Sequence, residues 1–180
     1  MTRLHHLLAA RWSPATFDAG HEVSDEEMAS LLEAARWAPS AGNSQPWSFL
    51  LGRRGDSVHT RLVAHLAGSA ARWAPTASVL VANLCHRRVE DTDWDYSEFA
   101  LYDLGQAVAH MTVQAQSLDL YARQFRAFRR EAVQADFGVP AHWEVTTMTA
   151  FGRPAPGAAP PDEPPSRPRR SLDDISWPTA

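Results

Sequence analysis

Apolar side chains recur at helical spacing in four stretches of the chain, residues 3–11, 24–36, 56–68 and 97–120. The second stretch begins with a capping-box pattern, because Ser24 is followed three residues later by Glu27. The fourth stretch is the longest and has a broad apolar face that includes Phe99, Tyr102 and Met111. A helix of that character is typical of the centre of a core or of a dimer interface.

Three further runs predict β-strands, at residues 46–52, 77–85 and 145–152. The run ASVLVANLC, at 77–85, is continuously apolar, which suits a strand that is buried on both faces. A covered strand combined with amphipathic helices implies a layered structure of helices and sheet. We find no internal repeat and no second domain boundary, so we expect one domain over residues 1–180.

The C-terminal part of the chain differs from the rest. Between Phe151 and Arg170 there are seven prolines, which excludes a helix or a central strand. Apolar side chains then return at Leu172, Ile175 and Trp177. We therefore expect residues 154–180 to form an extended arm that docks on another surface, and an arm that crosses to a partner subunit would explain both features.

The composition excludes several classes of protein. No run approaches the roughly 18 uninterrupted apolar residues of a transmembrane helix, and the N-terminus shows no signal-peptide pattern. The single cysteine, Cys85, cannot form an internal disulfide, which agrees with a reducing compartment, and we expect a cytoplasmic protein. The net charge of -4 disfavours a nucleic-acid partner, and we interpret the arginine-rich run 123–130 as a solvated helix face.

All the basic residues are arginine, and the chain contains no lysine. Chemistry that needs a lysine, such as a pyridoxal Schiff base or a Walker-type phosphate loop, is therefore excluded. The histidines are not spaced as metal ligands, and no GxSxG or GxGxxG motif is present, so we expect no metal site and no Rossmann fold. We interpret the acidic run 90–95 as a solvated loop rather than as a glycosidase pair.

The connection after the second predicted helix is long and chemically distinctive. Its sequence, WAPSAGNSQPW at residues 37–47, combines two prolines with small side chains and with amides. Small residues allow a ligand to approach the backbone and amides can hydrogen-bond a planar group, so the segment has the composition of a binding loop. A long turn that is only stiffened by its prolines is an equally compatible interpretation.

Two pairs of residues have the chemistry to hold a phosphate monoester without lysine. Arg11 and Ser13 follow the first predicted helix. Arg167 and Arg169 alternate on an extended segment, where side chains two residues apart point the same way. Guanidinium and hydroxyl groups suit a phosphate, although ordinary surface arginines are the alternative interpretation.

Taken in order, four motifs resemble the nitroreductase family of flavin enzymes over nearly the whole chain. They are R-x-S-P-x-x-F at 11–17, LLEAARWAPSAGNSQPW at 31–47, YDLGQAVAHMTVQAQSLDL at 102–120, and a terminal Gly-x-Pro at 152–154 followed by Pro-Arg-Arg-x-Leu at 168–172. The APSxxNxQPW element, at 38–47, is the most specific of the four.

The resemblance implies an α+β nitroreductase-like fold, with a central mixed sheet flanked by helices and an intertwined homodimer that exchanges C-terminal arms. It implies FMN at the subunit interface, NADH or NADPH as reductant, and a small planar acceptor, such as a nitroaromatic or quinone-like compound, in a ping-pong scheme. No side chain is expected to act as an acid or base. The implied cofactor-binding residues are Arg11, Trp12, Ser13, Pro39, Ser40, Ala41, Asn43, Gln45, Arg167 and Arg169.

The chain also departs from the family pattern. Ala15 stands where relatives commonly have a basic phosphate partner, Arg126 and Ala127 replace small residues near the reactive part of the flavin, and the run 68–78 lacks an Asn that often contacts the ring. Two alternatives therefore stay open. One is a flavin-binding or sequestering dimer without turnover. The other is a flavin oxidase or desaturase on a biosynthetic intermediate, with Arg126 binding a substrate carboxylate.

Overall fold

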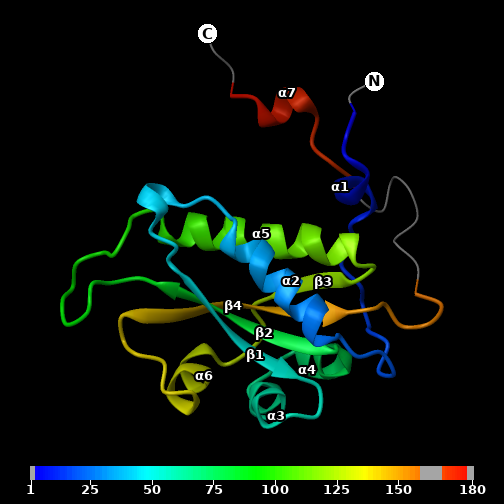
Figure 1. Ribbon diagram of the computed structural model, residues 1–180, viewed down its shortest axis with the longest axis horizontal. Coiled ribbons are helices and arrows are strands. Elements are labelled where there is room, and N and C mark those ends of the chain that lie inside the picture. Colours follow the sequence, from blue (N-terminus) through cyan, green and yellow to red (C-terminus); the bar gives the residue numbers. More distant parts are fainter. Residues whose placement is uncertain (1–2, 159–167, 178–180) are drawn as a thin grey trace.

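A four-stranded sheet with helices on both faces organises the chain (Figure 1). The computed structural model describes residues 3–158 and 168–177. The elements in chain order are α1 (His6–Ala10), α2 (Asp25–Arg36), the 3-10 turn η1 (Ala41–Asn43), β1 (Trp47–Arg53), α3 (Ser57–Ala64), α4 (Ala70–Trp73), the 3-10 turn η2 (Ala74–Thr76), β2 (Val79–His86), α5 (Ala100–Ser117), β3 (Tyr121–Phe125), α6 (Arg130–Asp136), β4 (Trp143–Gly152) and α7 (Leu172–Ile175).

The strand order is β1-β2-β4-β3, and each neighbouring pair is antiparallel. The α+β fold class is confirmed, but the expectation of a mixed sheet is wrong for the described residues. In the described residues, each strand runs opposite to the strand beside it. The predicted covered strand is β2, which is buried from Val79 to Cys85 and lies between two neighbours.

The two faces of the sheet carry separate cores because side chains alternate along each strand. In Figure 1, α2 and α5 cover one face, and α3, α4 and α6 cover the other. Val79 and Val81 of β2 pack with Met111 of α5, whereas Leu80 and Ala82 pack on the opposite side. On that side α3 sits directly on β1: a Cβ at Gly52 would lie 2.6 Å from the backbone nitrogen of His59.

The helices differ from the predicted ranges mainly at their ends. The predicted capping box of α2 is confirmed, with the Ser24 hydroxyl accepting from the Glu27 backbone N–H at 3.1 Å. The helix predicted at 3–11 is shorter in the structure, where α1 has only five residues. None of the five is buried. The long helix α5 is confirmed. Phe99 and Tyr102 of the predicted apolar face are 49% and 69% exposed, so they do not belong to the core of the described chain.

The arginine-rich run 123–130 is not a solvated helix face, and that interpretation is corrected. Its first half is the edge strand β3, since Tyr121–Phe125 pairs with β4. The Arg123 guanidinium donates to the Pro14 carbonyl at 2.9 Å and lies over the Trp73 ring at 4.2 Å. The arginines of this run therefore tie the N-terminal segment and the loops to the sheet.

The end of the chain stands apart from both cores. Residues 159–167, which include Arg167, lie outside the described part of the chain. In α7, Leu172 and Ile175 are 63% and 62% exposed, and Trp177 beyond it is 91% exposed. The arm therefore presents apolar side chains that the described part of this chain does not cover. Among the described residues, we find no helix with the length and apolar character needed to cross a membrane.

Candidate functional site

The predicted binding loop, residues 39–46, has an unusual backbone. Gly42, Asn43 and Gln45 have φ angles of 59°, 55° and 46°. Positive φ costs energy for residues with a side chain, so the surrounding structure must hold this conformation. Inside the loop, the Ser40 hydroxyl accepts a hydrogen bond from the Gln45 backbone N–H at 3.0 Å.

Three groups outside the loop hold it in place. A side-chain oxygen of Asp103, on α5, accepts from the Ala41 backbone N–H at 3.1 Å. The Tyr96 hydroxyl donates to the Ser44 carbonyl at 3.2 Å, and the backbone N–H of His86 donates to the Pro46 carbonyl at 3.0 Å. Because these groups fix its backbone, the loop can present the exposed residues Pro39, Ala41, Asn43 and Gln45 in one arrangement.

Arg11 and Ser13 lie in a groove of about 410 Å³ between the N-terminal segment, α5 and the edge strand β3. The Arg11 guanidinium lies 3.5 Å from the Ser13 hydroxyl. The N-terminal side of the groove carries a guanidinium and a hydroxyl, and the side formed by α5 and β3 combines small apolar side chains with the polar Thr112 and Gln124. Its lining residues are Leu8, Arg11, Ser13, Ala109, Thr112, Val113, Ala122 and Gln124.

The loop residues and the Arg11–Ser13 pair thus form two groups that do not meet within the described part of one chain. Asp103, which contacts the loop, and Thr112, which lines the groove, are nine residues apart on α5, or about 13 Å at the rise of an α-helix. Trp12 is only 6% exposed and packs edge-on against Tyr121, so its side chain is part of the core. Arg169 is exposed on the arm, and Arg167 is outside the described residues.

The groove includes residues that the sequence patterns did not point out. Gln124 of β3 donates to the Thr112 hydroxyl at 3.2 Å, and that hydroxyl donates to the Val108 carbonyl at 2.8 Å. The alternation of β3 would have placed Gln124 beside Ala122, but only if the run had been recognised as a strand. Asp103 had a clearer signal in the sequence, because it is a carboxyl residue within an apolar helical pattern. In the structure its side chain is buried, at 2% exposed.

The residues that depart from the family pattern are also placed by the structure. Ala15 is exposed, just after Ser13 and Pro14. The Arg126 guanidinium donates to the Phe128 carbonyl at 3.2 Å and lies 4.8 Å from the centre of the Phe128 ring. Arg126 is therefore folded against its own loop.

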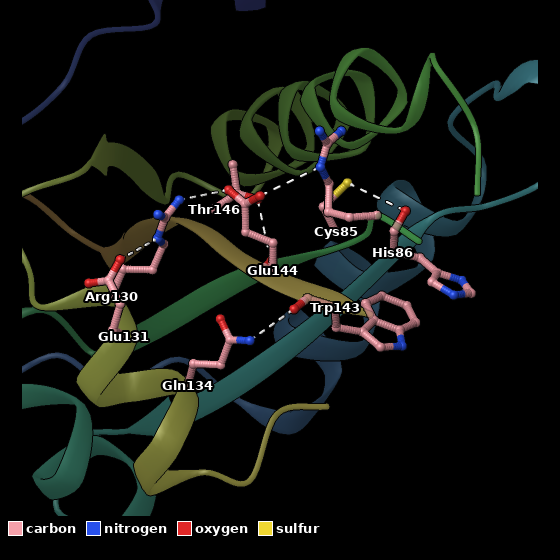
Figure 2. Close-up of polar contacts among 9 residues, drawn as sticks. Cys85, His86, Arg130, Glu131, Gln134, Trp143, Glu144 and Thr146 are labelled. Carbon is pink, nitrogen blue, oxygen red and sulfur yellow. Dashed lines mark hydrogen bonds and ion pairs between the residues drawn. The ribbon is translucent and has the colours of Figure 1, made fainter. Parts of the chain in front are cut away.

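Figure 2 shows a second polar cluster, at the end of β2 and the start of β4. Glu144 accepts from Arg130 at 2.9 Å and pairs with Arg87 at 3.5 Å. Burial raises the pKa of the Cys85 thiol to about 11, so this cysteine stays protonated near neutral pH. Among the residues that the structure describes, no group of three or more metal-ligating side chains is present. The cluster acts as a structural link between β2, β4 and α6.

Comparison with known proteins supports the resemblance seen in the motifs. The model of the nitroreductase family matches residues 8–72. A candidate NADH dehydrogenase or NAD(P)H nitroreductase of Archaeoglobus fulgidus is 26% identical over 137 residues, 74% of this chain and 75% of that protein. The major NAD(P)H-flavin oxidoreductase of Aliivibrio fischeri is 44% identical over 46 residues, 26% of this chain and 21% of that protein.

The fold is similar to that of a solved oxidoreductase containing FMN. The TM-score is 0.83 at 24% identity, and the alignment covers 98% of this chain and 91% of the other. The chain is therefore similar to the nitroreductase family in part of its sequence and has a nitroreductase-like fold, in agreement with the resemblance of its motifs.

Proposed function

We propose that this protein is an FMN-dependent oxidoreductase that works as a homodimer. It takes hydride from NADH or NADPH and passes electrons to a small planar acceptor of the nitroaromatic or quinone-like kind, in a ping-pong scheme. The observation that carries the proposal is the division of the predicted site into a loop and a groove that flank the same helix, α5, in a chain that is similar to this family.

A second copy of the chain would join the two halves. On α5, Leu101, Gly105 and Ala109 follow one another at intervals of four residues, so they share one face. This face is exposed at Leu101, Gly105 and the neighbouring Tyr102, and it ends at the groove, which Ala109 lines. A partner packed on this face would bring its own loop 39–46 to the groove.

Gly105 supports the same arrangement. Glycine inside a helix lowers stability by about 1 kcal/mol relative to alanine. In the described part of the chain, a Cβ at Gly105 would have no neighbour within 4 Å. The chain itself therefore gives no packing reason for a glycine here, whereas a closely approaching helix of a second subunit does.

The residues of the two halves fit the parts of FMN. The Arg11 guanidinium and the Ser13 hydroxyl are donors for the phosphate. The small apolar side chains of Ala109, Val113 and Ala122 can cover an aromatic ring and exclude water from it. The exposed amides and backbone groups of loop 39–46 can hydrogen-bond the polar ring edge. In this arrangement the bound flavin supplies the redox chemistry, and the protein supplies binding, orientation and access.

A specific observation supports each of two alternative functions. The exposed Ala15 leaves the phosphate with one basic partner fewer than the family pattern, which favours a flavin-sequestering dimer without turnover. The exposed Arg126, close in sequence to groove residue Gln124, favours an oxidase or desaturase whose substrate carries a carboxylate.

The first test is the visible spectrum of the untagged protein, followed by release and identification of any chromophore. We expect stoichiometric FMN that is bleached by NAD(P)H under argon. A colourless protein that cannot be loaded with FMN would contradict the proposal. The variant Arg126→Gly then separates the alternatives: turnover that appears only in the variant supports a degenerate site, and loss of activity on one acidic substrate supports the oxidase or desaturase.

A further inference from the structure

The binding loop adopts a backbone that isolated peptides disfavour. Asn43 and Gln45 both have positive φ, at 55° and 46°, and Gly42 precedes them at 59°. Each left-handed residue with a side chain costs on the order of 1 kcal/mol. A loop with two such residues so close together relaxes to other conformations unless contacts elsewhere in the fold hold it.

Two side chains from outside the loop contact it on the two sides of Gly42 and Asn43. The Asp103 carboxyl bonds the backbone of Ala41, just before them, and the Tyr96 hydroxyl bonds the backbone of Ser44, just after them. Each side chain reaches a backbone group, so the contacts act on the conformation of the loop whatever its side chains are.

Both side chains are themselves held in place. Asp103 is 2% exposed on the rigid helix α5 and lies 3.5 Å from the Gln106 amide. Tyr96 stacks on the His86 ring, with centroids 3.8 Å apart, and His86 stacks in turn on Trp143 at 4.7 Å. A fixed side chain makes a hydrogen bond at a smaller entropic cost than a mobile one.

We propose that Asp103 and Tyr96 are positioning residues that hold loop 39–46 in its FMN-binding conformation. This inference rests on the proposed function. Neither residue lines the groove, so neither needs to touch the cofactor. Both act by pre-organising the loop, and pre-organisation raises affinity because less ordering has to occur on binding.

The first experiment tests the hold on the loop without any flavin. Amide hydrogen exchange at residues 41–45 is compared among the wild-type protein, Asp103→Ala and Tyr96→Phe, all without FMN. We expect exchange at Ala41 to be at least fivefold faster in Asp103→Ala, and exchange across the segment to be faster in Tyr96→Phe. The matched control is Ser97→Ala, which removes a hydroxyl that accepts from the Phe99 backbone N–H near Tyr96 without reaching the loop.

The second experiment measures FMN binding by the same variants, through quenching of flavin fluorescence and the visible circular dichroism of bound flavin. A single net hydrogen bond corresponds to about a two- to tenfold change in an equilibrium constant. We expect Asp103→Ala and Tyr96→Phe each to weaken FMN binding by about three- to tenfold and to change the dichroism. Asp103→Asn, whose amide oxygen can still accept from Ala41, is expected to stay within about twofold of the wild type.

The outcomes separate this inference from the proposed function. Unchanged exchange in both variants overturns the hold on the loop. Faster exchange with unchanged FMN affinity overturns the positioning role. A wild-type protein that takes up no FMN overturns the proposed function and the cofactor role of the two residues, while the exchange data still decide whether they hold the loop.

Discussion

The two halves of the candidate site are built in different ways. Loop 39–46 has a demanding backbone and is held by contacts from α5 and from the connection between β2 and α5. The groove at Arg11 and Ser13 begins on α1, a helix of five residues that buries none of them. The loop is thus ordered by the fold of its own chain, whereas the groove is a surface that a partner and a ligand would complete.

The largest expected effect comes from keeping the two halves apart. Gly105→Glu places a charge on the exposed face of α5, where a Cβ meets no neighbour in the described chain, so the fold itself should tolerate it. Because the glutamate would be buried in the proposed dimer, we expect a monomer whose FMN affinity is reduced more than about 100-fold. Light scattering and flavin titration measure the two effects.

The control for this change is Ala135→Glu, which adds the same charge at an exposed position of α6, on the opposite face of the sheet (Figure 1). This variant should remain a dimer and bind FMN as the wild type does. If Gly105→Glu also remained dimeric with full FMN affinity, the joining of the two halves across α5 would be wrong.

A smaller loss is expected from the groove alone. Arg11→Ala removes a charge-assisted contact worth about 1.5 to 3 kcal/mol, so FMN binding should weaken by about 10- to 100-fold. Riboflavin lacks the phosphate, and its affinity should not change. Titration of both flavins measures the difference, with Arg72→Ala as the control at an exposed arginine of α4. Equal losses for both flavins would contradict a phosphate role for Arg11.

A gain of affinity tests the same groove from the other direction. Ala15 is exposed two residues after Ser13, so Ala15→Lys adds a cation to this segment without displacing a core side chain. We expect FMN to bind about three- to tenfold more tightly at low salt, and the gain to shrink as salt rises. Ala15→Gln has a side chain of similar size without the charge and should show no gain. The absence of a gain in the lysine variant would place the phosphate elsewhere.

The smallest effect is expected on the opposite face of the sheet, at Asp136. Hydrogen bonds from Arg61 and then from His65 hold the pKa of this carboxyl below its ordinary value. A lowered folded-state pKa adds stability above the unfolded pKa of about 3.9, and this stability is lost as the pH falls through the folded value.

Asp136→Asn should therefore lower the midpoint of thermal unfolding by a few degrees at most at pH 7, and by less as the pH falls below about 4. FMN affinity should not change, because neither half of the site contacts Asp136. Calorimetry at both pH values measures the difference, with the exposed Asp173→Asn as control. A constant difference at all pH values would contradict the ion-pair explanation.

Much of the fold could be predicted from local patterns. The capping box at Ser24 and the continuous apolar run of β2 each depend on residues that are close in sequence. The run 123–130 was misinterpreted because arginines within an aromatic-rich segment fit either a helix face or an edge strand. Only its pairing with β4, some 25 residues later, decides between them. The apolar face that includes Phe99 and Tyr102 left a core and a dimer interface open, because an apolar face indicates burial but not which surface covers it.

The candidate site divides in the same manner. The sequence by itself determined which groups are available: arginines without lysine, the Arg11 and Ser13 pair, and the amide-rich loop at 39–46. The order of its motifs also resembles that of the nitroreductase family. The tertiary structure decided where these groups stand. It separated loop and groove along α5, placed Gln124 and Thr112 together, and set Asp103 and Tyr96 against the loop. Chemical type is a property of each residue, whereas hydrogen bonds between residues tens of positions apart exist only after the chain has packed.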